Sequence, residues 1–129
     1  MTSPAERLSE PVRAPTPLRL LVTAAATAAW YDADADEQAE VAGRLRELIA
    51  TWLAQPSVTL VGSFDDDLLL AGDPRPFGRW SIFLLLDVST LDAAVAMVDA
   101  LRGGRPRLSR YFTLAATLGR PFWPAEDAR

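Results

Sequence analysis

The sequence of 129 residues contains no cysteine, histidine, lysine or asparagine. These absences exclude whole mechanisms, because thiol nucleophiles, histidine-based triads, lysine Schiff bases and His- or Cys-ligated zinc and haem sites lack their residues. Acid–base chemistry would have to use Asp, Glu, Tyr or Arg, and only a carboxylate whose pKa is raised by burial would titrate near neutral pH. We therefore expect no cofactor and no metal site.

Basic charge and long apolar runs are also scarce. The formal net charge is -4, whereas nucleic-acid affinity depends on basic stripes that release counterions from phosphates. No run of about twenty apolar residues is present, as a membrane-spanning helix would need. Residues 1–17 lack the apolar region of a signal peptide. We expect a cytoplasmic protein that binds neither nucleic acid nor membrane.

The apolar half of the composition is enough for one core. At 129 residues with 50% hydrophobic residues, the chain matches the usual size of a single domain. Residues 1–16 contain Pro4, Pro11 and Pro15 and show no apolar periodicity. This pattern predicts a flexible N-terminal arm. The folded domain is then expected over residues 17–118, followed by a C-terminal tail over 119–129 whose aromatic residues dock on a neighbouring surface.

Four segments have the pattern of strands. The first begins at Leu18 and is expected to continue weakly through an Ala/Thr run to Trp30, and the others are residues 57–64, 80–88 and 111–118. A loop punctuated by glycine and proline is predicted over residues 65–78.

Two segments have the spacing of amphipathic helices. Asp36 is expected to cap the first, whose apolar face includes Trp52 as a core residue and which Pro56 ends. Ser89 or Thr90 is expected to cap the second, and Gly103-Gly104 to stop it.

The order strand, helix, strand, strand, helix, strand predicts an α+β fold of the ferredoxin-like βαββαβ type. Such a fold has a four-stranded antiparallel sheet with both helices on one face. The strand 80–88 is almost continuously apolar, which indicates that both of its faces are covered. Because the helices cover one face only, we expect a homodimer in which a second sheet covers the other. The alternative is that loop 65–78 and the N-terminal arm fold across it.

Three sequence features carry a resemblance to a known family. They are residues 56–60 leading to Phe64-Asp65, the strand from Trp80 to Asp87 ahead of a helix containing Leu91, and Tyr111-Phe112 at the start of the last strand. Over residues 18–118 the chain resembles the dimeric α/β-barrel superfamily, and within it the small darcynin-like group. The resemblance implies two ferredoxin-like sheets packed face to face, with a pocket between the sheet and helices of each protomer.

The same resemblance implies candidate functions. Members of the superfamily include cofactor-independent oxygenases, isomerases, cyclases and haem-degrading enzymes. The familiar oxygenase site uses Asn, His and Trp, of which this chain has only Trp. The leading hypothesis is a small cofactor-independent enzyme of cyclase, isomerase or monooxygenase type that acts on an apolar aromatic or polyketide-like small molecule. The alternative is a non-catalytic dimeric ligand-binding or accessory module, which a filled interior would favour.

Polar and aromatic residues at the strand ends are the candidate site. The catalytic candidates are Asp87, which ends the most apolar strand, Asp65 at the end of the second strand, and Tyr111 at the start of the last. Their alternatives are structural: Asp87 capping a junction or pairing with an Arg, Asp65 in a solvated loop start, and Tyr111 as a core or interface residue. The substrate-binding candidates are Arg79, Trp80, Phe83 and Ser63.

Two acidic clusters invite a metal interpretation. Asp32, Asp34 and Asp36 have the spacing that opens an EF-hand loop, but Glu37 and Gly43 stand where that loop needs Gly and Glu. A polar turn at a helix N-terminus is the favoured interpretation. Residues 65–67 are three aspartates that offer oxygen ligands to a hard cation, and a solvated loop start is the favoured alternative.

Overall fold

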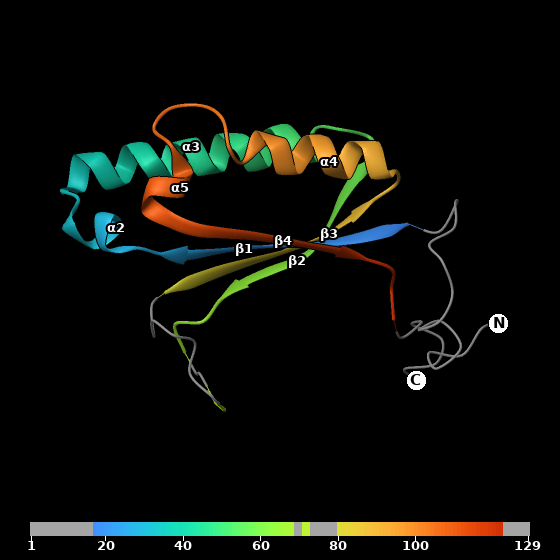
Figure 1. The fold of residues 1–129 in the computed structure, drawn as a ribbon, viewed down its shortest axis with the longest axis horizontal. Coiled ribbons are helices and arrows are strands. Elements are labelled where there is room, and N and C mark those ends of the chain that lie inside the picture. Colours follow the sequence, from blue (N-terminus) through green and yellow to red (C-terminus); the bar gives the residue numbers. More distant parts are fainter. Residues whose placement is uncertain (1–16, 69–70, 73–79, 123–129) are drawn as a thin grey trace.

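The computed structural model describes residues 17–68, 71–72 and 80–122. Eight elements follow one another along the chain (Figure 1): β1 (Leu18–Ala26), α2 (Ala28–Asp32), α3 (Ala35–Leu53), β2 (Val58–Asp65), β3 (Ser81–Val88), α4 (Leu91–Ala100), α5 (Leu108–Tyr111) and β4 (Phe112–Gly119). The long elements give the predicted βαββαβ order, so the α+β ferredoxin-like class is confirmed.

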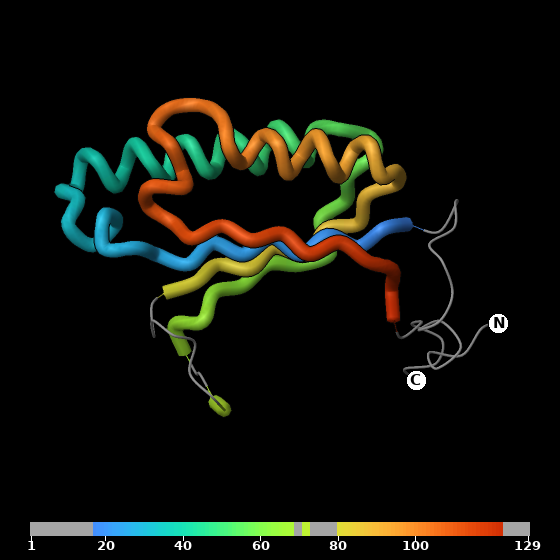
Figure 2. The backbone as a smooth tube through the Cα atoms, in the orientation of Figure 1, coloured from blue at the N-terminus to red at the C-terminus, as the bar shows by residue number. Residues whose placement is uncertain are grey.

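The four strands form one antiparallel sheet in the order β2-β3-β1-β4. The two long helices, α3 and α4, lie together on one face of it (Figures 1 and 2). The central strands β1 and β3 are paired on both sides, whereas β2 and β4 are the edges. The sheet therefore has a helix-covered face and a face that neither long helix covers, which we call the open face.

Alternation along β1 divides its residues between the two faces. Leu18, Leu20, Val22, Ala24 and Ala26 are buried, and the residues between them are half-buried. Successive side chains of a strand point to opposite sides of the sheet. The core joins the buried set of β1 from Leu20 onward to helix residues that include Val41, Leu48, Trp52, Ala94 and Met97. The helix-covered face therefore carries the hydrophobic core.

Two predicted boundaries at the start of the chain are wrong. β1 ends at Ala26, and the segment leading to Trp30 is the short helix α2 rather than more strand, because its alanines are good helix formers and the Trp30 side chain packs against the core. The first long helix is capped by Asp34, not Asp36, since the Asp34 side chain accepts a hydrogen bond from the Glu37 amide at 2.8 Å. Asp36 lies in the first turn of the helix, where the helix dipole stabilises a negatively charged carboxylate.

The second long helix follows the prediction more closely. Thr90 caps α4 by accepting a hydrogen bond from the Ala93 amide at 3.1 Å. After α4, Gly104 has a φ of 80°, a left-handed conformation that favours glycine. The turn α5 was not foreseen, so Tyr111 ends a helix and β4 begins at Phe112.

Candidate functional site

The central part of the space between the sheet and the helices is filled. Among the described residues, the cavity enclosed there has a volume of about 10 Å³ and is lined by apolar positions: Val22, Ala24, Leu45, Trp52, Ile82, Leu84, Leu101 and Leu114. Trp52 is 4% exposed, as predicted for a core residue. Its indole nitrogen has no hydrogen-bond partner in the described part of the chain.

An aromatic cluster closes one end of this core. The Trp30 ring lies 6.0 Å from the Trp80 ring and 5.3 Å from the Phe112 ring, measured between centroids. Both contacts are tilted arrangements, which aromatic pairs favour. Trp30 and Trp80, predicted to flank strands, therefore join the core, and Trp123 lies outside the described residues.

Asp65 and Asp66 bind the start of β3. Asp65 Oδ2 accepts a hydrogen bond from the Trp80 indole at 3.0 Å, and Asp66 Oδ1 accepts one from the Ser81 amide at 2.9 Å. The hydrogen bond from Trp80, followed by one from Asp67, lowers the pKa of Asp65. A hydrogen bond to Asp65, together with its negative charge, raises the pKa of Asp67. Both aspartates at β3 thus have structural partners.

The metal interpretation of these acids gains no support. Within residues 17–68, 71–72 and 80–122, no group of three or more Asp, Glu, His or Cys side chains is arranged to hold a metal ion. The hydrogen bonds of Asp65 and Asp66 instead join the end of β2 to the segment that opens β3.

Asp87 lies on the open face and is paired with arginine. The Arg19 guanidinium donates to both carboxylate oxygens, at 2.9 Å to Oδ1 and 3.3 Å to Oδ2. The two residues are directly opposite in the β1–β3 register, where opposite charges stabilise a sheet. Pairing with an Arg, the structural alternative for Asp87, is therefore what the structure contains.

The substrate-binding candidates are also dispersed. Phe83 lies on the open face, where its ring stacks on Phe64 with centroids 4.7 Å apart. Ser63 is exposed on the edge strand β2, opposite Leu84, and Arg79 lies outside the described residues. In the β2–β3 register, Asp65 of β2 is opposite Ile82 of β3, and Asp87 of β3 is opposite Thr59 of β2. The two carboxylates therefore lie at opposite ends of the sheet. The described candidates therefore do not converge on one pocket.

Tyr111 is buried at 6% exposure, as its structural alternative predicts. A hydrogen bond to Glu37 raises the pKa of the Tyr111 phenol, with burial and the Glu37 charge as further causes. Each of these favours the neutral phenol over the phenolate. The stability that this arrangement contributes is complete below the unfolded-state pKa of tyrosine and is lost as pH rises through the higher folded-state value.

Titration of the two tyrosines tests this contact. In Glu37→Gln the neutral amide can still accept a hydrogen bond but carries no charge, so the pKa of Tyr111 should fall by the part that the Glu37 charge contributes. Ultraviolet absorbance of the phenolate, followed between neutral and strongly alkaline pH, measures the change. Glu47→Gln, on the same helix, is the matched control and should leave the titration unchanged. If both variants give the same titration curve at alkaline pH, the contact between Glu37 and Tyr111 is contradicted.

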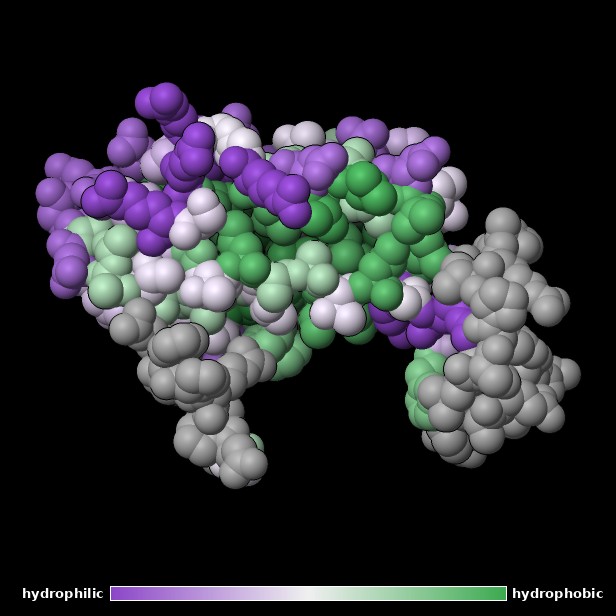
Figure 3. Space-filling view, in the orientation of Figure 1, coloured by the Kyte–Doolittle hydropathy of each residue, from purple (hydrophilic) through white to green (hydrophobic). Residues whose placement is uncertain are grey.

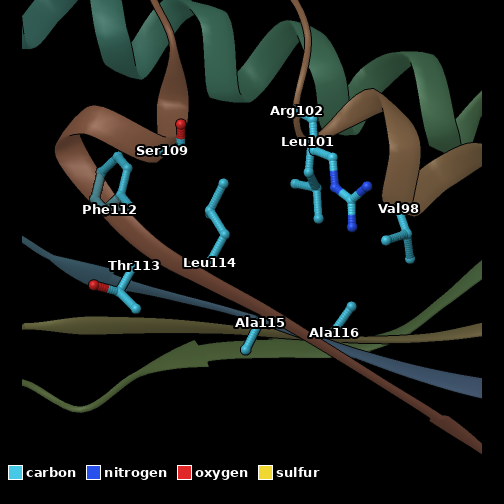
Figure 4. Close-up of a pocket in the computed structure, with 9 residues that line it drawn as sticks. All are labelled: Val98, Leu101, Arg102, Ser109, Phe112, Thr113, Leu114, Ala115 and Ala116. Atoms are coloured by element: carbon cyan, nitrogen blue, oxygen red, sulfur yellow. The ribbon is translucent and has the colours of Figure 1, made fainter.

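Two surface grooves lie beside α4. The larger, about 540 Å³, lies between the end of α4 and β4 and is lined by Val98, Leu101, Arg102, Ser109 and residues 112–116 (Figure 4). The smaller, about 240 Å³, is lined by residues of α3 and α4, including Trp52 and Met97. Sequence reasoning missed the larger groove, although the spacing Leu91, Val95, Val98, Arg102 is a helical stripe that could have indicated it.

Comparison with known proteins gives one structural likeness. No protein-family model matches the sequence, and no curated protein matches it either. A solved structure described as a dimeric ferredoxin-like protein of unknown function from Thermobifida fusca is similar to the chain, with a TM-score of 0.47 and 15% identity over 86% of this chain and 96% of that one. The darcynin-like subgroup is not confirmed.

The described helices do not have the character of membrane spans. In the part of the chain that the structure describes, none combines the length and the apolar character that crossing a bilayer requires.

Proposed function

We propose that the chain is a non-catalytic accessory module that assembles as a homodimer through the open face of its sheet. The observation that carries this proposal is the filled interior. A cavity of about 10 Å³ is at the lower limit for a single water, whereas ligand pockets usually measure about 300–1,000 Å³. The centre of the space between the sheet and the helices is occupied by side chains, and the larger groove of about 540 Å³ opens only at its β4 edge.

The engagement of the polar candidates supports the same proposal. Asp87 is bound by Arg19, Asp65 by Trp80, and Tyr111 is buried beside Glu37. A catalytic group needs a reacting atom within hydrogen-bond reach. None of these three side chains lines the interior cavity, so a structural role accounts for each of them.

Apolar residues on the open face supply the assembly surface. Leu21 and Leu85 are directly opposite each other at the centre of the sheet, with Gly62 next to Leu85 on β2. Phe64 is 65% exposed although its ring stacks on Phe83. Exposed apolar patches of this kind mark interaction sites. Two open faces packed together would bury the two half-buried leucines and the exposed ring of Phe64, which stacks on the already buried Phe83.

The Arg19–Asp87 pair on the same face is compatible with burial in a dimer. Removing one partner of a buried ion pair is costly, whereas a pair that is already hydrogen-bonded carries no unmatched charge. The two hydrogen bonds from Arg19 satisfy both carboxylate oxygens. An open face that contains this pair can therefore pack against a second sheet.

Leu85→Asp tests the open-face dimer. The substitution places a carboxylate at the centre of the proposed interface, where burial without a partner is strongly unfavourable. Light scattering at micromolar concentration should show that the wild-type chain associates and that the variant no longer does so through this face. Leu53→Asp, on α3 away from the open face, is the control and should leave the mass of the assembly unchanged. A wild-type mass equal to the single chain, 14.0 kDa, would refute the proposal.

A further inference from the structure

A second apolar surface runs along α4, away from the open face. One side of α4 and of the turn that follows it carries Leu91, Val95, Val98 and Arg102. Their spacing of four, three and four residues is that of one helix face. Leu91 is 59% exposed and Val95 is 51% exposed. The space-filling view shows apolar side chains gathered between the polar top of the helix layer and the sheet (Figure 3). This stripe has no covering element in the described residues.

The edge strand β4 lies next to this stripe, and within the described residues no element covers its free edge. Its sequence, FTLAATLG, contains no charge and no proline, and its eight residues pair with β1 without a register shift. In natural proteins a charge, a proline or a bulge usually prevents an edge strand from pairing with a strand of another molecule. The other edge, β2, has an irregularity between Leu60 and Gly62 and ends in Asp65. Of the two edges, β4 is the regular and uncharged one.

The groove of about 540 Å³ joins the stripe to this edge. Five consecutive residues of β4, 112–116, line it. Consecutive residues of a strand point to opposite faces, so a groove that contacts all five runs along the strand's edge. Figure 4 shows Val98, Leu101 and Arg102 above β4, with Leu114 and Ala116 below them. An extended strand laid beside β4 would enter this groove.

We propose that the α4/β4 edge is a second self-association surface, at which β4 pairs antiparallel with β4 of another copy and α4 packs against its counterpart. Two-fold contacts are isologous, so the same patch must be complementary to itself. An antiparallel strand of small and apolar residues and an apolar helix stripe meet this condition. The inference rests on the proposed role as an assembly module but uses a different surface.

Charge at the two ends of α4 identifies a second copy as the occupant. Asp92 lies beside Leu91 in the first turn, and Arg102 follows the last turn. When two α4 helices run antiparallel about their middle, Arg102 of each copy approaches Asp92 of the other. Neither residue has an ion-pair partner within the described ranges. The pairing would therefore complete two equivalent salt bridges, one at each end of the interface.

A charge swap tests this arrangement on the full chain. The substitution Arg102→Glu places a glutamate near Asp92 of the other copy, and Asp92→Arg places two arginines together. Because of the two-fold axis, each substitution creates this repulsion twice. Each should therefore raise the dissociation constant of the edge contact at least about a hundredfold. The double variant restores opposite charges and should recover the wild-type assembly. Arg46→Glu, with the same charge change on an exposed position of α3, is the matched control. Light scattering over a range of protein concentrations reads out the mass.

The open-face and edge contacts give separable results. With both intact, the expected mass is about four chains of 14.0 kDa, and Arg102→Glu should reduce it to two. In the Leu85→Asp background the edge contact alone should give two chains, and adding Arg102→Glu should give one. If Leu85→Asp has no effect, the open-face proposal fails while the charge swap still judges the edge.

Amide hydrogen exchange provides a readout of strand pairing. Protection of residues 112–119 should increase with protein concentration in the wild type and in the double variant, but not in either single variant. The edge proposal is overturned if the single variants assemble like Arg46→Glu, or if the double variant fails to recover. Concentration-independent exchange of β4 in the wild-type chain would do the same, and would leave the groove to a foreign strand or a small anionic ligand.

Discussion

Replacing Leu86 with alanine is expected to lower the free energy of unfolding by about 2–5 kcal/mol, the usual range for a buried leucine. Leu86 is fully buried in the central strand β3, opposite Leu20 on one side and Leu60 on the other. Its loss would leave a void beneath both helices, in a core whose own cavity is only about 10 Å³. Against a total stability of about 5–15 kcal/mol for a domain, this is a large fraction.

The same change at an exposed leucine is the control. Leu68 is 95% exposed, so Leu68→Ala should alter the free energy of unfolding by less than about 0.5 kcal/mol. Urea denaturation of both variants at one protein concentration makes the comparison, because association contributes to apparent stability. Equal midpoints for the two variants would mean that Leu86 is not in a packed core.

Gly104→Ala is expected to cost about 1–2 kcal/mol, the penalty for a side chain in the left-handed region. Gly104 has a φ of 80°, and a Cβ atom at this position would overlap the guanidinium group of Arg44. Arg44 would have to move, which would break its 3.4 Å hydrogen bond to the Gly103 carbonyl. The turn after α4 would then lose both its favoured backbone conformation and its tie to α3.

Gly103 is the control position, because it shows the effect of a glycine-to-alanine change without strain in the backbone. At Gly103 a Cβ atom would meet nothing within 4 Å, and its φ is not positive. Gly103→Ala should therefore be neutral, or stabilising by about 0.4–1 kcal/mol through the unfolded chain. Thermal unfolding of the pair at matched concentration supplies the measurement. A Gly104→Ala variant as stable as Gly103→Ala would contradict a left-handed turn here.

The filled interior changes which functional hypothesis the chain supports. Sequence reasoning placed a small-molecule pocket between the sheet and helices, by resemblance to enzymes with that arrangement. In the structure, Trp52, Leu84 and Leu114 are among the side chains that fill this space. The larger spaces open to the surface beside α4, and the one of about 540 Å³ shares Leu101 and Leu114 with the small interior cavity. Our proposal therefore concerns association through the surfaces of the chain, which can be measured without knowledge of a substrate.

Local sequence signals predicted most of the fold. Short apolar and β-branched runs, alternating in 57–64 and almost continuous in 80–88, located the strands, and three-to-four spacing located α3 and α4. Thr90 could be foreseen as a cap because its side chain serves the helix that it precedes. The choice between Asp34 and Asp36 could not, since both precede the apolar periodicity and the backbone at Asp34 decides. The short helices α2 and α5 likewise depend on packing at the ends of β1 and β4.

The sequence by itself determined the βαββαβ order, the buried position of Trp52 and the chemistries that four missing residue types exclude. Only the tertiary structure decided the fate of the polar candidates, because a strand's residues are assigned to faces and partners by its neighbours. Register placed Arg19 opposite Asp87 across residues far apart in the chain, and packing brought Asp65 to Trp80. It also aligned Arg102 with the edge of β4, a juxtaposition that helix spacing alone does not specify.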